Sequence, residues 1–487
     1  MNEQSVMGGG QVHQYLQYIG QDVQPDTGRY LDKLSPSSGL KMGTVAVGSA
    51  ADVDMAVRHA WEAFPAWRNR HPMERGRVLN EIARKIREQV GRFAELEALE
   101  TGKPAWQAPI EIETAAKYFE FYAGLVNLPK GEVLDLGPAY HAYTAREPFG
   151  VVGVILPWNS PLNQAARSIA PAIAVGNVVV AKPSEETPGT LVMLARMAVE
   201  ECGLPAGVLN VVQGSGKETG AALVAHPLVR KVAFTGSVRG GREVGKVAAE
   251  RIIPLTLELG GKSPNIVFDD ADLEAAVAGA IRAFSVNAGQ VCLAGTRLLV
   301  QETIHDEFVA KLVAAVEQMK VGPQSDAQVG ALSTSAQFEK VQSYFDVGIQ
   351  DGATLAVGGR ALTPEEGRGG WYVRPTVFTG VRPDMRIARE EIFGPVLAVL
   401  PFTDEADAVR IANDTEYGLA AGIWTRDLGC AHRVAAQLEA GQIYINQYMP
   451  GGVEAPLGGY KQSGYGRERG IEALHHYTQL KSIIIKI

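Results

Sequence analysis

Val151-Val-Gly-Val-Ile-Leu156 and Asn177-Val-Val-Val-Ala181 are short apolar runs that predict two buried β-strands. Apolar residues at helical spacing follow each run, at residues 164–174 and 189–201. The pattern then repeats, with strands predicted at residues 208–212 and 231–235 and helices at residues 220–225 and 242–251. Successive strand–helix alternations of this kind are typical of a parallel sheet that helices cover on both faces.

The chain before this sheet is predicted to be helical, because apolar residues recur at helical spacing within residues 50–101. We expect Pro65 to interrupt the first helix and Pro72 to open the next one. Residues 1–45 are polar and rich in glycine, which indicates an extended arm and a short hairpin.

A second alternating region begins near Asn265 and continues to about residue 445. Its first helix is expected to be capped by Asp270, and Cys292 follows that helix in a loop. The remaining predicted elements are strands at residues 265–268 and 296–300 and a helix at residues 307–319. The pattern therefore predicts an α/β fold with two parallel-sheet domains.

Composition narrows the class of protein. The 487 residues are 46% hydrophobic and 21% charged, as in ordinary globular proteins of two or three domains. The net charge of −8 argues against nucleic-acid binding. No signal peptide is recognised, and no apolar run approaches the ~18 residues of a membrane helix. The three cysteines lie far apart, which favours a reducing compartment, and a cytoplasmic protein is expected.

Two residues point to covalent chemistry. Cys292 ends the run Asn287-Ala-Gly-Gln-Val-Cys292, and Glu258 lies in Leu255-Thr-Leu-Glu258-Leu-Gly-Gly261. A thiol in a glycine-containing loop is a candidate nucleophile, and a carboxylate in an apolar strand is a candidate base. Together they suggest attack on a carbonyl carbon. The alternatives are a buried structural cysteine and a salt-bridged Glu258, although a lone carboxylate is costly to bury.

Several predicted strands end in residues that suit ligand binding. Asn159 can donate its amide to an oxyanion or cap the next helix, and Lys182 and Glu185 can hold ribose hydroxyls or form a solvated loop. The glycine-containing turns at residues 214–220 and 234–241 each open a helix whose N-terminus can receive a phosphate.

Two other motifs fail on closer reading. The first glycine turn has one residue too many for a G-x-G-x-x-G fingerprint. Gly261-Lys262-Ser263 is not a phosphate-binding loop, because Thr256 stands where that motif requires its first glycine. The histidines show no ligand spacing, so no metal site is predicted.

These segments jointly resemble the aldehyde dehydrogenase superfamily, and the resemblance runs over nearly the whole chain. The motifs follow the family's order and spacing: Pro157-Trp-Asn159, Lys182-Pro-Ser-Glu185, Phe234-Thr-Gly-Ser237, Glu258-Leu-Gly-Gly261, Gly289-Gln-Val-Cys292, Glu391-Ile-Phe393-Gly-Pro395 and Pro456-Leu-Gly-Gly-Tyr460-Lys. The resemblance implies a Rossmann-like cofactor domain (1–128 and 148–258), a catalytic domain (259–460) and oligomerisation strands (129–147 and 468–487).

The resemblance also implies roles for single residues. Cys292 would be the nucleophile, Glu258 the base that activates the deacylating water, and Asn159 an oxyanion donor beside the Cys292 backbone N–H. NAD would be the cofactor, with NADP as the alternative, and Glu185 would favour NAD. The implied cofactor-binding residues are Leu156, Trp158, Lys182, Ser184, Glu185, Gly216, Gly220, Phe234, Gly236, Ser237, Gly241, Leu259, Glu391 and Phe393.

The substrate is implied only as an aldehyde, a semialdehyde or an aromatic aldehyde in particular. Arg167 either grips a substrate carboxylate or forms a structural ion pair, and Leu457 is a second candidate substrate contact. The alternatives are a coenzyme A-acylating enzyme and a non-catalytic scaffold of the same fold. Glu258 disfavours the first, since coenzyme A needs no water-activating base, and the complete residue set disfavours the second.

The chain is also expected to form a homodimer or homotetramer. Residues 129–147 alternate apolar and polar side chains outside both sheets, and the tail at residues 482–487 is an apolar strand. Pairing of such edges removes an aggregation hazard.

Overall fold

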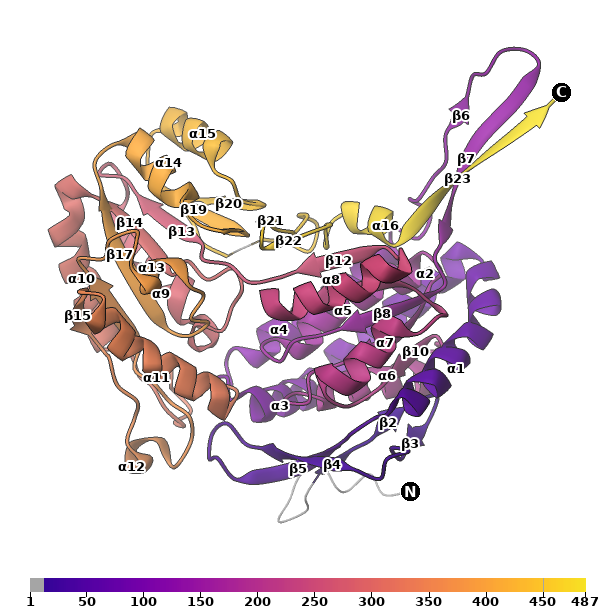
Figure 1. The fold of residues 1–487 in the computed structure, drawn as a ribbon, viewed down its shortest axis with the longest axis horizontal. Coiled ribbons are helices and arrows are strands. Elements are labelled where there is room, and N and C mark those ends of the chain that lie inside the picture. Colours follow the sequence, from indigo (N-terminus) through magenta and orange to yellow (C-terminus); the bar gives the residue numbers. More distant parts are fainter. Residues whose placement is uncertain (1–12, 450) are drawn as a thin grey trace.

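The structure is a computed structural model that describes residues 13–449 and 451–487. Two lobes, each built around its own sheet, lie side by side, and a narrow arm projects from one of them (Figure 1). The first twelve residues of the predicted N-terminal arm lie outside the described range. No helix in that range is long and apolar enough to span a membrane.

The first sheet holds five parallel strands at its centre, in the order β12-β11-β8-β9-β10. These are β8 (Val151–Ile155), β9 (Val178–Lys182), β10 (Leu209–Val211), β11 (Val229–Thr235) and β12 (Leu255–Glu258). Antiparallel strands extend both edges: β22 (Gly464–Tyr465) beside β12, and β2 (Gln17–Tyr18) with β3 (Asp22–Val23) beside β10. The carboxyl ends of the central strands therefore meet at one edge.

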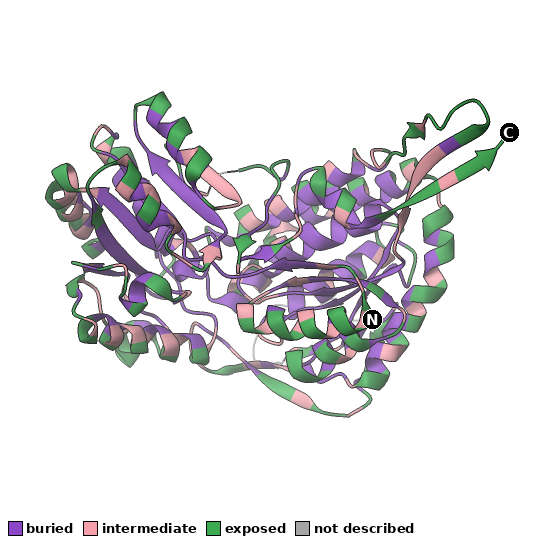
Figure 2. Cartoon of the chain, turned by 45° about the horizontal axis from the view of Figure 1, so that its top comes forward, coloured by how far each residue is buried: buried purple, intermediate pink, exposed green. Residues whose placement is uncertain are grey.

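Helices cover both faces of this sheet, and the central strands are buried within them (Figure 2). The helices are α1 (Ala50–Asn69), α2 (Pro72–Glu88), α3 (Val90–Thr101), α4 (Ala108–Ala123), α5 (Pro161–Ala174), α6 (Gly189–Glu200), α7 (Ala221–Ala225) and α8 (Val238–Arg251). The prediction that residues 50–101 are helical is confirmed, as is the opening of α2 at Pro72.

The second sheet has the order β15-β16-β17-β14-β13-β19-β20 and is parallel except for β15. Its strands are β13 (Pro264–Val267), β14 (Arg297–Gln301), β15 (Thr354–Val357), β16 (Thr376–Thr379), β17 (Val396–Phe402), β19 (Ala420–Trp424) and β20 (Gln442–Ile445). Its main helices are α9 (Leu273–Ser285), α10 (His305–Glu317), α11 (Ser335–Gln350), α14 (Glu405–Asn413) and α15 (Leu428–Gln437). The predicted fold class, two parallel-sheet α/β lobes with a small additional β element, is confirmed.

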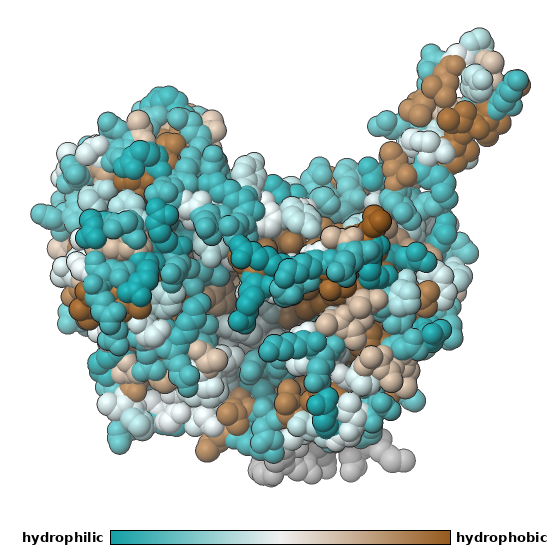
Figure 3. Space-filling model, viewed as in Figure 1, coloured by the Kyte–Doolittle hydropathy of each residue, from teal (hydrophilic) through white to brown (hydrophobic). Residues whose placement is uncertain are grey.

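The projecting arm is a three-stranded antiparallel sheet of β6 (Val133–Leu134), β7 (Tyr140–Pro148) and β23 (Thr478–Lys486). The chain's own β7 thus provides the partner that the C-terminal tail was expected to need. Apolar side chains nevertheless remain exposed on the arm (Figure 3), among them Val133, Leu136, Leu480, Ile484 and Ile487. A further sheet of β1 (His13–Tyr15), β5 (Lys41–Ala46) and β4 (Tyr30–Leu34) stands where a short hairpin was expected.

Two local predictions were wrong. Pro65 does not interrupt α1, because the last turn is held by buried Trp67, whose Nε1 donates to the Ile173 carbonyl at 3.0 Å. Asp272 caps α9, because Asp270 instead accepts N–H bonds at the start of α15, from Arg426 and Asp427.

The helix predicted at residues 220–225 is confirmed as α7 (Ala221–Ala225), and a π-helical turn at Gly216–Gly220, which was not predicted, precedes it.

Candidate active site

Cys292 lies in a tightly fixed loop after α9. The backbone of Asn287 and Ala288 is left-handed, with φ of 52° at both residues, so the helix cannot continue. Gly289 follows at φ 72°, and a Cβ there would lie 2.3 Å from the Gly394 carbonyl. Only glycine fits this close approach, which explains why the loop before the thiol carries one.

Amide side chains hold the same loop from two directions. Gln290 accepts from the Ser333 backbone N–H at 2.9 Å and donates to the Asn287 carbonyl at 2.9 Å. Asn159, just after β8, donates its side-chain amide to the Gln290 carbonyl at 2.9 Å, and Asn287 donates to the Asn159 carbonyl at 2.8 Å. The segment after β8 and the cysteine loop are therefore coupled directly.

Cys292 lies between two cavities. A cavity of about 320 Å³ opens on the side of the first sheet, and a cavity of about 220 Å³ opens on the other side, toward α4 and α5. Cys292, Asn159 and Gln164 line both of them. We refer to the larger as the cofactor-side cavity and to the smaller as the substrate-side cavity. Two molecules entering from opposite sides can therefore meet at one sulfur atom.

The surroundings of Cys292 favour the protonated thiol over the thiolate. Burial raises the pKa of Cys292 to about 11, although the positive charge of Arg167 opposes the shift. A nucleophilic thiolate therefore needs a base or a further positive charge.

Glu258 is the last residue of β12 and lines the cofactor-side cavity with Cys292. Burial raises its pKa to about 8; Arg167 opposes this rise and Glu468 adds to it. The Glu258 Oε1 atom is buried and has no hydrogen-bond partner in the described part of the chain. A carboxyl group with a pKa near neutrality and a free oxygen has the properties of a general base.

Arg167 does not point its charge freely into the substrate-side cavity. Its guanidinium forms an ion pair with Glu468 and donates to Thr235 Oγ1 at 3.0 Å. Glu468 also accepts from Ser168 Oγ at 2.7 Å, and both partners of the pair are almost fully buried. Of the two readings of Arg167, this geometry favours the structural ion pair.

The cofactor-side cavity has the groups that a dinucleotide requires. Ser237 caps α8 and accepts from the Gly240 N–H at 3.1 Å, which places the positive end of a helix dipole at the cavity. The rings of Trp158 and Phe393 meet edge to face at 5.4 Å. The predicted residues that line this cavity are Trp158, Gly236, Ser237, Leu259, Glu391 and Phe393.

Glu391 reaches this cavity from the second lobe. Its carboxylate accepts from the Gly261 N–H at 2.9 Å, and a Cβ on Gly260 would lie 2.2 Å from it. Burial raises the pKa of Glu391, which the Gly261 bond opposes. The Glu-Leu-Gly-Gly motif is thus explained by the room that this carboxylate needs.

The other predicted cofactor residues are not among those that line this cavity. Lys182, at the end of β9, donates to the Gly214 carbonyl at 2.6 Å and lies 3.5 Å from Glu185. Gly220 packs against the Lys182 side chain. The residues that do not line the cofactor-side cavity are Leu156, Lys182, Ser184, Glu185, Gly216, Gly220, Phe234 and Gly241.

The sequence reasoning missed several residues of both cavities. Gln337, Lys340 and Arg239 line the cofactor side; Lys340 donates to the Glu391 carbonyl at 2.8 Å, and Gln337 to that of Phe393 at 2.8 Å. On the substrate side, Tyr118 and Arg469 were missed. Arg239 lies within the glycine-containing turn at residues 234–241, whereas the other four stand in no motif with a recognisable local pattern.

Leu457, the second predicted substrate contact, lies behind the wall of the substrate-side cavity. It is 1% exposed, is not among the residues that line the cavity in the described chain, and packs in an apolar cluster with Leu293 and Tyr448. Cys292 packs against the same cluster. A role of Leu457 in substrate binding stays a prediction.

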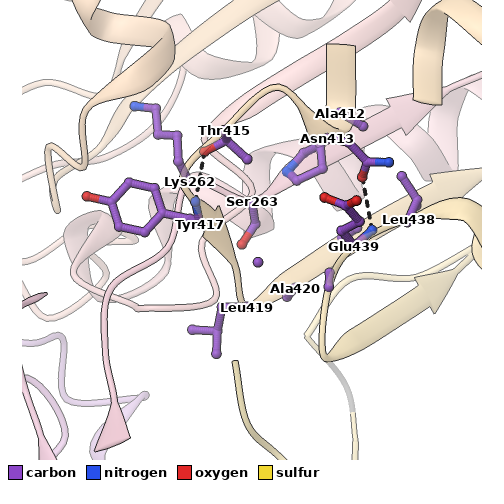
Figure 4. Close-up of a pocket in the computed structure, with 14 residues that line it drawn as sticks. Lys262, Ser263, Ala412, Asn413, Thr415, Tyr417, Leu419, Ala420, Leu438 and Glu439 are labelled. Carbon is purple, nitrogen blue, oxygen red and sulfur yellow. Dashed lines mark hydrogen bonds between the residues drawn. The ribbon is translucent and has the colours of Figure 1, made fainter. Parts of the chain in front are cut away.

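A third hollow, between β13 and the segment after α14, is too small for an organic ligand. Its volume is about 10 Å³, which suits roughly one water molecule. Figure 4 shows its polar contacts, where the Tyr417 N–H donates to Thr415 Oγ1 at 3.2 Å and the Glu439 N–H to Asn413 Oδ1 at 2.9 Å.

Comparisons with known proteins agree with the site. Residues 23–483 match the model of the aldehyde dehydrogenase family. A betaine aldehyde dehydrogenase of Mesorhizobium japonicum is 46% identical over 470 residues, covering 96% of each chain. A betaine aldehyde dehydrogenase structure from Staphylococcus aureus in complex with NAD⁺ is 39% identical, with a TM-score of 0.95 and 97% of each chain covered. An indole-3-acetaldehyde dehydrogenase complexed with NAD⁺ is 41% identical, with a TM-score of 0.95, covering 98% of this chain and 97% of that one.

Proposed function

The chain belongs to the aldehyde dehydrogenase family, and we propose that it oxidises an aldehyde to the carboxylic acid with NAD⁺, through a thioester on Cys292. The observation that carries the proposal is the position of Cys292 between two cavities, with Glu258 in the cofactor-side cavity beside it.

The cofactor-side cavity fits NAD⁺ by the chemistry of its groups. The N-terminus of α8 at Ser237 suits the pyrophosphate, and Glu391 can accept hydrogen bonds from a ribose. Phe393 and Trp158 give the cavity an apolar wall for the nicotinamide. Lys182 and Glu185 would hold the second ribose, outside this cavity. When bound, NAD⁺ supplies the two-electron oxidant that takes a hydride from the substrate carbon.

Cys292 does the first part of the chemistry. Its S–H proton passes to solvent water as the sulfur adds to the aldehyde carbon, and the carbonyl oxygen becomes the oxyanion of a tetrahedral intermediate. The Asn159 side-chain amide, which already faces the cysteine loop, and the Cys292 backbone N–H would donate to that oxygen. Each such donor is worth about 3 kcal/mol. Loss of hydride from the tetrahedral carbon leaves the thioester.

Glu258 does the second part. Its ionised carboxylate removes a proton from a water molecule, whose oxygen attacks the thioester carbon. The C–S bond breaks, the carboxylic acid leaves and the Cys292 thiol is restored. A base of this kind supports hydrolysis over transfer to coenzyme A, because a thiol acceptor does not need it.

The proposal includes an assembly and a compartment. We infer that the arm of β6, β7 and β23 pairs with a second copy of the chain in a homodimer or homotetramer, because its exposed apolar side chains and open strand edge would otherwise promote aggregation.

The three cysteines are unpaired, which supports a reducing, cytoplasmic environment. The domain boundaries stay a prediction; the chain crosses from the first sheet to the second between Glu258 and Pro264.

Replacing the nucleophile tests the function. Cys292→Ala is expected to abolish NAD⁺ reduction by every aldehyde while leaving the fold and NAD⁺ binding intact. Cys430→Ala is the matched control and should keep its activity, because Cys430 is buried in the second lobe among apolar residues. The assay is run with and without coenzyme A. More than a few percent residual activity in Cys292→Ala, or a requirement for coenzyme A, would contradict the proposal.

A further inference from the structure

Resting on the proposed function, we propose that Arg469 binds a carboxylate, or an anion of the same kind, on the substrate, so that the preferred substrate is an acidic aldehyde. Tyr118 would be the second donor to that anion. The charge and the hydrogen-bond donors of the substrate-side cavity carry this inference.

Two hydrogen-bond donors lie together in the substrate-side cavity. Arg469 and Tyr118 both line it, and the Arg469 Cζ atom lies 6.0 Å from the centre of the Tyr118 ring. Burial raises the pKa of Tyr118, and the charge of Arg469 and a hydrogen bond with it oppose the rise, so the two side chains act on each other. Neither is paired with a carboxylate within the described chain. A carboxylate, with two acceptor oxygens, can bond to both at once.

The remaining charges around the cavity are compensated. Arg167 is paired with Glu468. Glu111, the other charged residue in the wall, accepts from Lys103 at 2.6 Å and from Gln107 at 2.7 Å. Arg469 forms no ion pair within the part of the chain that the structure describes. Among the described residues of the wall, Arg469 is therefore the one charged side chain without an oppositely charged partner.

The backbone fixes where this charge lies. Arg469 has φ 59°, a left-handed conformation that non-glycine residues rarely adopt. The residues on both sides of Arg469 are anchored. The Gly470 N–H donates to the Val453 carbonyl at 2.8 Å, and Glu468 forms the buried ion pair with Arg167. A strained backbone that presents an unpaired guanidinium to a cavity is typical of a binding site.

The same wall argues against a quaternary ammonium substrate. Such cations are held by cages of several aromatic rings. Among the described residues of the substrate-side cavity, Tyr118 is the one aromatic side chain, and the Arg469 guanidinium already lies over its ring. A trimethylammonium group would meet a like charge there. The chain therefore differs in this respect from what the names of its betaine aldehyde dehydrogenase relatives suggest.

The test compares aldehydes that differ in charge. The purified full-length protein is assayed with 4-oxobutanoate, 5-oxopentanoate, their methyl esters, and trimethylammonioacetaldehyde. The wild type should prefer at least one acid over its ester by about 10-fold or more in kcat/KM. Arg469→Gln should lower this acid-to-ester ratio by about 10- to 100-fold, the value of a hydrogen bond to a charged group. Arg469→Lys should keep most of the ratio.

Two controls make the result specific. Arg467→Gln removes a nearby positive charge that lines neither cavity, and it should leave the acid-to-ester ratio within about 3-fold. Calorimetric binding of succinate and glutarate to Cys292→Ala reports the anion site without turnover. Adding Arg469→Gln to Cys292→Ala should weaken the binding of both dicarboxylates by about 10- to 100-fold.

The outcomes separate the two proposals. A ratio that is unchanged in Arg469→Gln, a wild-type preference for trimethylammonioacetaldehyde, or dicarboxylate binding that ignores Arg469 would overturn the anion site. Oxidation of none of the five aldehydes would instead count against the proposed function, and the calorimetry would still decide the role of Arg469.

Discussion

Deacylation should depend on pH through Glu258. The carboxyl has a pKa of about 8, raised chiefly by burial, and only its ionised form can take a proton from water. At pH 7 about 10% of it is ionised, and at pH 9 about 90%. Wherever hydrolysis of the thioester limits turnover, the steady-state rate should rise about 9-fold between these values.

Glu258→Gln is the matched perturbation, because it keeps the shape of the side chain and removes the base. Stopped-flow measurement of the reduced nicotinamide separates the two halves of the reaction. The burst reports thiol addition and hydride loss, whereas the steady phase reports hydrolysis. We expect the variant to keep its burst, to lose most of its steady rate, and to lose the rise between pH 7 and pH 9.

Two results would refute this reasoning. A wild-type steady rate that is flat between pH 7 and pH 9, with the burst present, would show that no group of this pKa limits hydrolysis. Loss of burst and steady rate together in Glu258→Gln would place Glu258 earlier, in the activation of the Cys292 thiol.

Three other predictions concern the cofactor, the core and the arm. The wild type should have a higher kcat/KM with NAD⁺ than with NADP⁺, because Glu185 repels a 2′-phosphate. Glu185→Gln should lower the ratio of kcat/KM with NAD⁺ to kcat/KM with NADP⁺. Equal or better use of NADP⁺ by the wild type would exclude this role of Glu185. Burial lowers the pKa of Lys231 to about 7, so between pH 7 and about 10 the unfolded chain holds a proton that the folded chain does not. This group should therefore raise the free energy of unfolding by up to about 4 kcal/mol as the pH rises across that window. Denaturant unfolding of Lys231→Met should show no such rise. The same pH dependence in the wild type and in Lys231→Met would exclude this role of Lys231. Deleting residues 481–487 should weaken assembly and lower Tm, whereas light scattering that finds the intact protein monomeric would rule out the assembly.

Part of the active site was predictable from the sequence. Glu258 and Asn159 stand in short motifs at the carboxyl ends of strands, and parallel topology brings such ends to one edge. Cys292 instead follows a helix, and its glycine-containing loop marked it as a candidate nucleophile. The same reasoning placed Ser237 at a helix N-terminus, and the structure finds it capping α8.

Residues that reach the site through tertiary packing were not predictable. Arg469 enters the substrate-side cavity from a loop far along the chain, and only the fold shows that it has no ion-pair partner among the described residues. The pairing of Arg167 with Glu468 joins residues about 300 positions apart. Pro65 misled the helix prediction because the anchoring of Trp67 on α5 outweighs one lost hydrogen bond.

The most direct test of a thioester on Cys292 is to trap it. Glu258→Gln is mixed with NAD⁺ and an aldehyde that the wild type oxidises, quenched in acid within the burst, digested and measured by peptide mass spectrometry. We predict that the peptide containing Cys292 gains the mass of the acyl group, in an amount that matches the burst of reduced cofactor. A burst without any adduct, or an adduct on Cys202 or Cys430 instead, would contradict the mechanism.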